Sequence, residues 1–389
     1  MNITQLTISN FRNLRNMTLY PSSCNVFVGA NGSGKTSLLE SIYLLSRGKS
    51  FRHHQPKHYI AHGYPTTTVF AQLGATQTVA IEKSLDASTQ LRLDGESVTT
   101  QSPLAQRLPT LLLEPATLSQ LEQGSQARRE LLDWLVFHVE QSFHGSWLSY
   151  QRLLRQRNSL LKRYQGHAEL SVIQRHELQA WDNQLSAYAA AIHQARSAMI
   201  KRWQPYFEAQ IQVFLPAYAH QLRLRYSAGF DVERGLGAML SERLPMDRDL
   251  GYTRVGSHRA DLNVIMNLVT TDGHGRAQKN TLPATDMLSR GEKKLLMMAL
   301  RLSQLPLLNA VNKTPLVLID DITAELDSTA LSLLLSGLQA LKSQLFITSL
   351  SDDMVTSLMA IWQEDVTVFH VKHGEVAPIS LPISEAAWS

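Results

Sequence analysis

The sequence has a single cysteine, Cys24, among 389 residues, and it has no apolar run long enough to cross a membrane. One cysteine excludes a disulfide framework within the chain and favours a reducing compartment. A spanning helix would need an uninterrupted apolar run of about 18 residues or more. Residues 1–6 also lack the basic flank and apolar core of a secretory signal. We therefore expect a cytoplasmic protein with no membrane partner.

The sequence also lacks a strong excess of charge, since charged residues make up 18% of the chain and hydrophobic residues 44%. These proportions are ordinary for a globular protein. The net charge of +4 and the isoelectric point near 9.1 permit an acidic partner such as nucleic acid without requiring one. The 14 histidines show no metal-ligand spacing. At about 150 residues per domain, the length corresponds to two or three domains.

A glycine-rich stretch carries the clearest chemistry in the sequence. It matches the pattern G-x-x-x-x-G-K-[ST] at every fixed position, after an apolar strand pattern and before a helical one. Glycines allow the backbone to approach a phosphate closely, and the loop and helix N–H groups can then face its oxygens. The lysine would reach the β- and γ-phosphates, and the hydroxyl would ligate Mg²⁺. The residues are Gly29, Ala30, Asn31, Gly32, Ser33, Gly34, Lys35 and Thr36. A glycine-rich turn that binds nothing is the alternative, but the complete match favours a nucleoside triphosphate.

A second motif opens a helical pattern near residue 290. Residues 288–294 read Leu-Ser-Arg-Gly-Glu-Lys-Lys, which resembles the signature sequence L-S-G-G-Q of ABC-type ATPases. Ser289 and Gly291 could present a hydroxyl and N–H groups to a γ-phosphate at the helix N-terminus. The same residues also make an ordinary helix cap, so the motif alone leaves both interpretations open.

Two further acidic motifs follow the signature. An apolar strand pattern ends at Asp320 and Asp321, which in P-loop enzymes stand near Mg²⁺ and near the attacking water, respectively. Paired acids can also cap a helix. Residues 324–327, Ala-Glu-Leu-Asp, match a loop that crosses the dimer interface of ABC-type ATPases, although Asp327 could equally cap the helix after it. The order of these motifs after a complete P-loop indicates an ABC-type ATPase.

Strand and helix patterns divide the chain into three segments. Residues 1–124 form the first part of the ATPase head, with the P-loop and an antiparallel β lobe that contains a hairpin at Asp94 and Gly95. Residues 125–250 form a compact helical arm domain, in which we expect Pro205 to kink or interrupt a helix. Residues 251–389 complete the head. The predicted fold class is therefore α/β, with a mixed sheet, flanking helices and a β lobe interrupted by the arm.

The spacing of the motifs separates the subclasses of ABC-type ATPases. Transporter subunits place the signature on the order of 100 residues after the P-loop and follow the next strand with a histidine. Here roughly 250 residues intervene and no histidine follows residues 344–348. Both features argue against a subunit that drives a membrane partner. Two antiparallel helices of about 50 residues would reach only about 75 Å, so the insert is no long rod.

A compact arm on a split head is similar to the RecF family, the bacterial DNA replication and repair proteins of the SMC-like class. The similarity covers residues 1–375 approximately and is clearest in five stretches: residues 6–14, 28–43, 128–133, 154–162 and 252–262. The family usually reads Gly-Pro-His-Arg-Asp-Asp where this chain has Ser257 and Ala260. Glu292 stands where glutamine is common, and Glu114 where an uncharged residue is more usual.

The resemblance implies an ATP-dependent DNA-binding protein for repair and replication restart, with Mg²⁺ and slow, DNA-dependent ATP hydrolysis. ATP would join two copies into a homodimer in which Ser289 of one copy faces the P-loop of the other. Arg12, Asn31 and Asp327 would lie at the nucleotide, and Asp321 would orient or activate the water. The implied partners are duplex DNA with a preference for duplex–gap junctions, RecR and RecO, which together place RecA on gapped DNA and link the family to the SOS response. A clamp with negligible hydrolysis is the alternative.

Direct support for DNA binding is thinner. From residue 145 to residue 235 there are 12 Lys and Arg residues against 6 Asp and Glu residues. One predicted helix contains no acid and carries five cations, which are Arg152, Arg155, Arg157, Lys162 and Arg163. These side chains would neutralise phosphates without reading bases, although a solvated helix face has the same composition. His258 and Arg259 also allow two interpretations. They could contact a phosphate or nucleotide, or they could be a packed histidine beside a surface arginine. Arg128 and Arg129 could pair with Glu130 and Asp133 in neighbouring turns.

Overall fold

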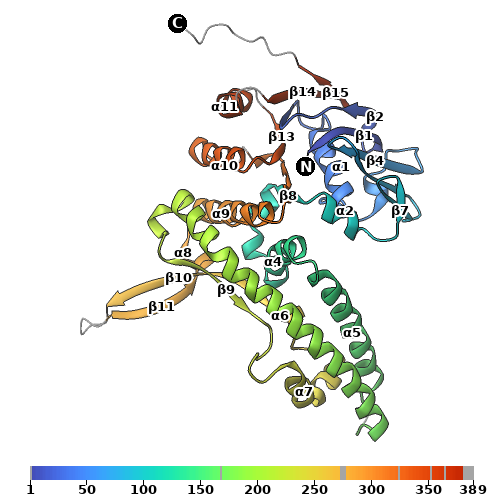
Figure 1. Ribbon diagram of the computed structural model, residues 1–389, viewed down its shortest axis with the longest axis vertical. Coiled ribbons are helices and arrows are strands. Elements are labelled where there is room, and N and C mark those ends of the chain that lie inside the picture. The colour runs from blue at the N-terminus through green and yellow to red at the C-terminus, as the bar shows by residue number, and fades with distance from the viewer. Residues whose placement is uncertain are drawn as a thin grey trace. The chain divides into compact units, whose positions relative to one another are not determined.

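The computed structural model describes residues 2–166, 169–271, 277–322, 325–350, 353–362 and 365–379 (Figure 1). By its internal contacts the chain divides into two compact units. Unit 1 contains Met1–Leu118 and Leu308–Ser389, and unit 2 contains Ser119–Leu307. Among the described residues, no helix combines the length and apolar character needed to cross a bilayer.

The first sheet of unit 1 is the mixed sheet expected of a P-loop protein. Its strands lie in the order β15-β14-β3-β13-β12-β8, and all neighbours are parallel except β14 and β15. Central strands β3, β13 and β12 are buried along their whole length, which explains their nearly continuous apolar sequences. Cys24 lies buried in β3, and burial raises the pKa of its thiol to about 12. The strand bounds are β3 Cys24–Val28, β8 Thr110–Leu113, β12 Leu316–Ile319, β13 Gln344–Ser349, β14 Val366–Lys372 and β15 Glu375–Pro378.

The second sheet of unit 1 is the predicted antiparallel β lobe. Its order is β2-β1-β4-β5-β6-β7, and its alternating burial fits a sheet with one covered face. Asp94 and Gly95 join β6 to β7 with φ angles of 52° and 84°, which confirms the predicted hairpin. The bounds are β1 Ile3–Phe11, β2 Leu14–Leu19, β4 Thr66–Leu73, β5 Gln77–Ser84, β6 Thr89–Leu93 and β7 Glu96–Val98.

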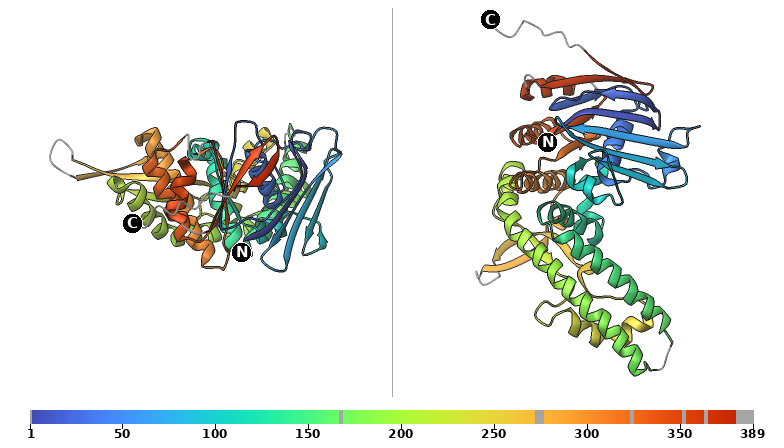
Figure 2. Two further views of the ribbon diagram at one scale, coloured as in Figure 1. Left: turned by 90° about the horizontal axis from the view of Figure 1, so that it is seen from above. Right: turned by 45° about the vertical axis from the view of Figure 1, so that its right-hand side comes forward.

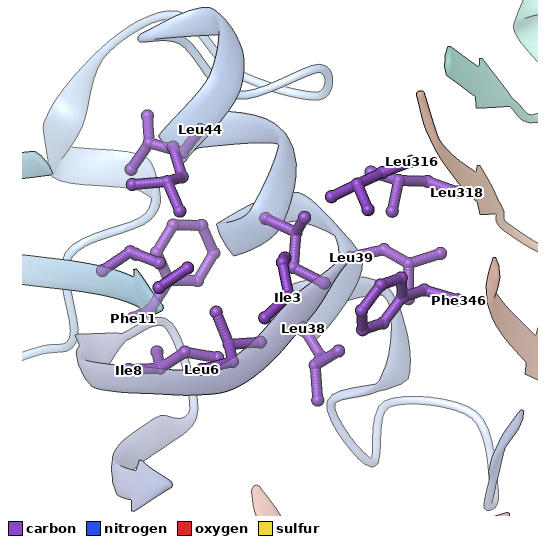
Figure 3. Close-up of a cluster of buried hydrophobic side chains, with 14 of the residues drawn as sticks. Ile3, Leu6, Ile8, Phe11, Leu38, Leu39, Leu44, Leu316, Leu318 and Phe346 are labelled. Atoms are coloured by element: carbon purple, nitrogen blue, oxygen red, sulfur yellow. The ribbon is translucent and has the colours of Figure 1, made fainter. Parts of the chain in front are cut away.

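Helix α1, Lys35–Arg47, joins the two sheets through one hydrophobic core (Figure 3). Leu38, Leu39 and Leu44 of the helix belong to the same buried cluster as side chains from both sheets. Those side chains are Ile3, Leu6, Ile8, Phe11, Leu316, Leu318 and Phe346. Because α1 is packed on both sides, the loop that precedes it is held firmly between β3 and the first helical turn. The other helical segments of unit 1 are η1 Pro56–His58, α2 Ser102–Arg107, α3 Pro115–Leu118, α10 Ser328–Ala340 and α11 Asp353–Trp362.

Unit 2 is built around helix α6, Val172–Phe214, whose 43 residues extend over about 65 Å. Ser171 and Gln174 form a capping box at its start. The helix continues through Pro205, so the proline does not interrupt it, and the alternative expectation of a kink stays a prediction. Trp203 and Phe207, on either side of the proline, are both fully buried and hold the helix in the core despite the lost N–H donor. Helix α5, Phe143–Arg163, confirms the predicted helix that carries the five cations between residues 152 and 163, and it lies antiparallel beside α6 (Figure 2).

A three-stranded antiparallel sheet in unit 2 has the order β11-β10-β9. Strand β9, Leu222–Ser227, falls inside the segment interpreted from sequence as a helical arm, and it pairs with β10, Asp261–Thr271. Trp203 of α6 also donates a hydrogen bond of 2.7 Å to Ser303 of α9, Arg290–Asn309. Through these contacts residues 251–307 group with the helices, whereas the sequence-based division assigned them to the head. The remaining bounds are η2 Gln120–Glu122, α4 Ser125–Val139, η3 Pro216–Tyr218, α7 Leu236–Leu250, η4 Ser257–Arg259, β11 Ala277–Pro283 and α8 Ala284–Met287.

Candidate functional site

The glycine-rich stretch forms the predicted strand–loop–helix, because β3 ends at Val28 and α1 begins at Lys35. Gly32 and Gly34 have φ angles of 76° and 122°, in the region that favours glycine. A Cβ at residue 29 would lie only 2.3 Å from the carbonyl oxygen of Val371, so that position has no room for a side chain. The sequence pattern thus reflects backbone requirements that the structure makes explicit.

Lys35 is the first residue of α1, and its side chain reaches back into the preceding loop. Its Nζ donates hydrogen bonds to the carbonyl oxygens of Gly29 (2.6 Å) and Ala30 (3.0 Å). Burial lowers the pKa of Lys35, while the charges of Asp321 and Asp320 oppose that shift. A partly desolvated ammonium group held among backbone oxygens can transfer its hydrogen bonds to an incoming phosphate.

Asp320 stands at the carboxyl end of β12, where one of its oxygens accepts two hydroxyl hydrogen bonds. The donors are Thr36 (3.0 Å) and Thr348 (2.9 Å). Burial raises the pKa of Asp320, and Asp321 raises it further, against the effect of the two hydroxyls. A carboxylate and a threonine hydroxyl are the oxygen ligands that Mg²⁺ prefers, so these residues fit the predicted ion. The described residues contain no group of three or more His, Cys, Asp or Glu side chains suited to a metal, so water and phosphate oxygens would complete its coordination.

Asp321 lines the pocket in front of the loop and has a φ angle of 49°, which is uncommon for a residue other than glycine. Its backbone N–H donates to the Thr348 hydroxyl at 3.0 Å. The Thr348 hydroxyl therefore contacts both neighbouring acids. It donates to the side chain of Asp320 and accepts from the backbone N–H of Asp321. Sequence inspection gave Thr348 no role.

The pocket in front of the loop has a volume of about 560 Å³. Arg12 faces it, and two contacts of 2.7 and 2.8 Å join the guanidinium of Arg12 to the fully buried carboxylate of Glu40. The Asn13 amide donates to the carbonyl oxygen of Ser33 at 3.0 Å and so holds the loop from the side. The full lining is Arg12, Asn13, Asn31, Gly32, Ser33, Gly34, Lys35, Thr36, Ser37, Arg52, His58, Ile60, His62 and Asp321.

Two charged residues at this site were missed or left unassigned by the sequence analysis. Arg52 lines the pocket, and its guanidinium lies 3.8 Å from Asp320. Glu114 follows β8 at the position next to Asp320, because Leu113 and Ile319 are register partners in the parallel sheet. Burial raises the pKa of Glu114 to about 7, and the nearby charge of Asp320 contributes. Only the pairing of two strands distant in sequence brings Glu114 to this place.

Ser289 and Gly291 lie at the start of α9 in unit 2. The Ser289 N–H donates to Glu292 at 2.8 Å, and the Glu292 N–H points back to the Ser289 hydroxyl at 3.4 Å. The Tyr218 hydroxyl donates to the other oxygen of Glu292 at 2.8 Å. Hydrogen bonds from Ser289 and then Tyr218 lower the pKa of Glu292. The motif is therefore a helix cap in which Glu292 replaces the usual glutamine.

Asp327 caps α10, since its carboxylate accepts the N–H of Ala330 at 2.7 Å. This geometry agrees with the capping interpretation. Its other predicted role, beside a nucleotide at a dimer interface, stays a prediction. Ala324, the first residue of that motif, lies outside the described residues.

Arg157, predicted to contact DNA, is fully buried instead. It pairs with Asp182 of α6 at 2.7 Å and with Asp247 of α7 at 2.9 Å, and it donates to the Thr253 hydroxyl at 2.7 Å. The prediction for this residue was wrong, because α5 turns position 157 towards its neighbours. Arg157 joins three elements of unit 2 and is not available to a phosphate.

The other four predicted cations of α5 are exposed, namely Arg152, Arg155, Lys162 and Arg163. They lie three, seven and one residues apart along a helix that contains no acidic residue. Within the described part of the chain, none of the four has an ion pair. These side chains are exposed to solvent, and their role in DNA binding stays a prediction.

His258 is a packed histidine. Its Nε2 donates to the Thr253 carbonyl oxygen (3.1 Å), so its Nδ1 accepts from the Tyr150 hydroxyl at 2.8 Å. Burial lowers the pKa of His258 to about 4, which keeps the imidazole neutral near pH 7. Arg128 pairs with Asp261 at 2.8 Å, so it does not pair within its own helix as one interpretation allowed.

Asp133, the acid expected to pair with Arg128 or Arg129, pairs with Arg196 at 2.8 Å instead. The Arg129 guanidinium donates to the Ala260 carbonyl oxygen at 2.7 Å. Arg128 and Arg129 therefore link α4 to the start of β10 and to the residue that precedes it. Arg128 and Asp133 thus have partners outside α4, rather than the partners within α4 that the sequence suggested.

Comparison with known proteins places this geometry in a family. The family profile described as "RecF/RecN/SMC N terminal domain" matches residues 2–376. The "DNA replication and repair protein RecF" of Acinetobacter baylyi is 41% identical over 377 residues, which cover 97% of this chain and 99% of the relative. The RecF protein of Teredinibacter turnerae is 35% identical over 381 residues, with 96% of each chain covered.

Solved structures agree with the sequence comparisons. The structure described as "the recombination mediator protein RecF-ATP in RecFOR pathway" superposes with a TM-score of 0.79 at 22% identity, covering 97% of each chain. An SMC head bound to a domain of ScpA superposes with a TM-score of 0.56 at 15% identity, covering 99% of each chain. These likenesses confirm the predicted fold class, an ABC-type ATPase head of the RecF and SMC kind.

Proposed function

This chain belongs to the RecF family of DNA replication and repair proteins, and we propose that it acts there as an ATP-dependent DNA-binding protein. The observation that carries the proposal is the joined acid and hydroxyl pair at the P-loop. Thr36 at the start of α1 reaches Asp320 at the end of β12, and Lys35 and Asp321 stand beside them. These are the groups that phosphoryl-transfer sites use to hold and hydrolyse a triphosphate.

ATP with Mg²⁺ is the proposed ligand of the pocket. The N–H groups of residues 29–36 and the ammonium of Lys35 would hold the phosphates, with Arg12 and Asn31 also at the nucleotide. Thr36 and Asp320 would hold Mg²⁺, which supplies charge neutralisation at the phosphates. Asp321 would orient or activate the attacking water. A similar solved structure is described as RecF with ATP, which supports this choice.

ATP would also be a dimerisation ligand. Ser289 and Gly291 at the N-terminus of α9 can offer a hydroxyl and N–H groups to the γ-phosphate held by a second copy, with Asp327 at the same interface. A ligand that binds only the dimer stabilises it by mass action, and loss of the γ-phosphate on hydrolysis reverses this effect. We propose that slow hydrolysis resets a clamp on DNA.

DNA would be bound without sequence selectivity, through the exposed cations of α5 and with a preference for duplex–gap junctions. The similar solved proteins are described as members of a RecFOR pathway. Accordingly we propose RecR and RecO as partners in placing RecA on gapped DNA, within the response to DNA damage. The mediator role rests on family membership, whereas the ATP role also rests on the site.

Light scattering with and without ATP tests the proposal. ATP should convert a species of 43.6 kDa into one of twice that mass, and Lys35→Met should abolish the change. Asp321→Asn should keep the dimer and slow single-turnover ATP decay by a factor of about ten or more. Equal decay in parent and variant would favour a clamp with negligible hydrolysis. A monomer at every ATP concentration, with and without gapped DNA, would defeat the proposal.

A further inference from the structure

The segment between α7 and β10, residues 251–260, runs antiparallel along α5. Three hydrogen bonds to α5 or the turn after it mark its course. Gln165 donates to the carbonyl oxygen of Asp249, which lies at the end of α7 just before the segment (2.7 Å). Within the segment, the Thr253 N–H donates to the Asn158 side chain (2.9 Å) and His258 contacts the Tyr150 hydroxyl (2.8 Å). As the segment advances, its partners therefore step back towards the start of the helix.

Further contacts fix the backbone of this segment. Arg157 donates to the Thr253 hydroxyl at 2.7 Å, and Arg196 of α6 donates to the carbonyl oxygen of Ser257 at 2.8 Å. The N–H of Gly256 donates to Gly229 at 3.0 Å. Side chains that leave such a backbone start from defined positions, which lowers the ordering cost of binding a ligand.

Two arginines leave this fixed segment towards solvent, Arg254 and Arg259, and both are exposed. Within the described residues neither guanidinium has an ion pair, although the backbone N–H of Arg254 donates to Asp247 at 3.3 Å. In contrast, the guanidinium groups of Arg128, Arg157 and Arg196 are all paired with acids. The unit thus contains two kinds of arginine. Arg128, Arg157 and Arg196 hold elements together, whereas Arg254 and Arg259 present charge to solvent.

The charge around Arg259 is crowded. Burial lowers the pKa of Arg129, and the charges of Arg196 and Arg259 lower it further, although Asp133 and Asp261 act in the opposite direction. Arg259 and Arg129 also disfavour a charge on His258. Repulsion between neighbouring cations disfavours the free state and is relieved when an anion binds.

We infer that residues 251–260 form a second row of phosphate contacts beside α5, through Arg254 and Arg259, and that duplex DNA is the ligand. The inference rests on the proposed DNA-binding function and extends it to a segment that composition left open. The exposed cations of α5 extend from residue 152 to residue 163, about 16 Å of helix, which corresponds to about five phosphates along one strand. Two rows of cations on a fixed scaffold suit a polyanion with regularly spaced charges better than a single small anion.

The contacts would go to the sugar–phosphate backbone and carry no sequence information. Each cation that neutralises a phosphate releases a counterion and contributes about 0.9 to the slope of log affinity against log salt. Loss of Arg254 or Arg259 should therefore lower the slope by about that amount, and loss of both by about 1.8. The decrease should be the same for unrelated sequences.

Anisotropy of fluorescent blunt and gapped duplexes, with ATP and Mg²⁺ at several salt concentrations, measures this slope. The variants are Arg254→Gln, Arg259→Gln and the pair, with Arg92→Gln as the matched control. Arg92 is an exposed arginine in β6 of unit 1 and has no ion pair among the described residues. We expect the control to keep the parental slope and Arg254→Lys to restore it. Unchanged ATP-dependent sizing and an unchanged thermal midpoint would show that the variants are folded.

Two negative outcomes are distinguishable. A parent that binds no duplex under any condition would overturn the proposed function itself. A parent that binds with a steep salt dependence, while Arg254→Gln, Arg259→Gln and the pair keep its slope, would overturn this inference and leave the proposed function standing.

Discussion

Replacement of Arg157 by glutamine separates a structural arginine from those offered to DNA. The substitution removes the partner of Asp182 and Asp247, which are 7% and 0% exposed. Breaking a buried ion pair by removing one partner destabilises a protein by about 3–5 kcal/mol. For a unit of this size 1 kcal/mol corresponds to roughly 2–4 °C, so the thermal midpoint of unit 2 should fall by about 10 °C.

The loss should depend on pH with a defined sign. Burial already raises the pKa of Asp182, against the effect of Arg157. Without Arg157 that pKa should rise further. The folded variant then takes up a proton that the unfolded chain binds only at lower pH, so its deficit should shrink as the pH falls towards the unfolded value near 4.

Arg155→Gln is the matched control, since Arg155 lies two residues earlier on the same helix, is exposed, and has no ion pair with any described residue. Urea unfolding followed by circular dichroism should place this variant within about 0.5 kcal/mol of the parent. Its DNA affinity should fall and its salt slope decrease by about 0.9. An Arg157→Gln protein with parental stability but weakened DNA binding would refute the assignment, as would an Arg155→Gln protein that unfolds early.

Three further predictions follow from ionisable groups. The unfolding free energy should fall by up to about 3 kcal/mol as the pH is lowered from 6.5 to 4, on account of His258. In this range the unfolded chain binds a proton at His258, whereas the folded imidazole, with its pKa near 4, stays neutral. His258→Gln should flatten that part of a urea-derived stability curve. Glu114 acts with the opposite sign, since its pKa near 7 lets the folded state hold a proton that the unfolded chain releases, and stability is lost as the pH rises from 4.5 to 7. Glu114→Gln should remove that loss, and an unchanged curve would contradict the placement of this acid. Glu292→Gln removes a negative charge at the cap of Ser289, so ATP should promote the dimer at several-fold lower concentration in a light-scattering titration. A higher ATP requirement would show that the carboxylate is needed at the cap.

The P-loop could be predicted from sequence because its physics is local. Glycine conformations, the lysine and the threonine all lie within eight consecutive residues. The fold class followed from the order of such local motifs. The grouping of residues 251–307 with unit 2 depends instead on pairing over long distances, as when β10 joins β9. No periodicity within either strand reveals its partner.

Arg157 shows a different limit. Composition alone does not distinguish the five cations of α5, but their positions around the helix do. Arg157 lies three residues after the buried Leu154 and four before the buried Leu161, so spacing alone places it on their face. Its acidic partners come from α6 and α7, and that fact required the tertiary structure. Glu292 looked like a departure from the family pattern, and the structure gives it hydrogen bonds to Ser289 and Tyr218.

The central claim is that each nucleotide site is shared between two copies of the chain. A mixing experiment tests it most directly. Lys35→Met damages the P-loop half of the site and Ser289→Arg the signature half, so each variant alone should stay monomeric with ATP. Mixed together, they can form one intact site from the P-loop of one and the signature of the other, and ATP should produce a heterodimer visible by light scattering. A mixture that stays as monomeric as either variant alone, or a Ser289→Arg protein that dimerises like the parent, would contradict the account.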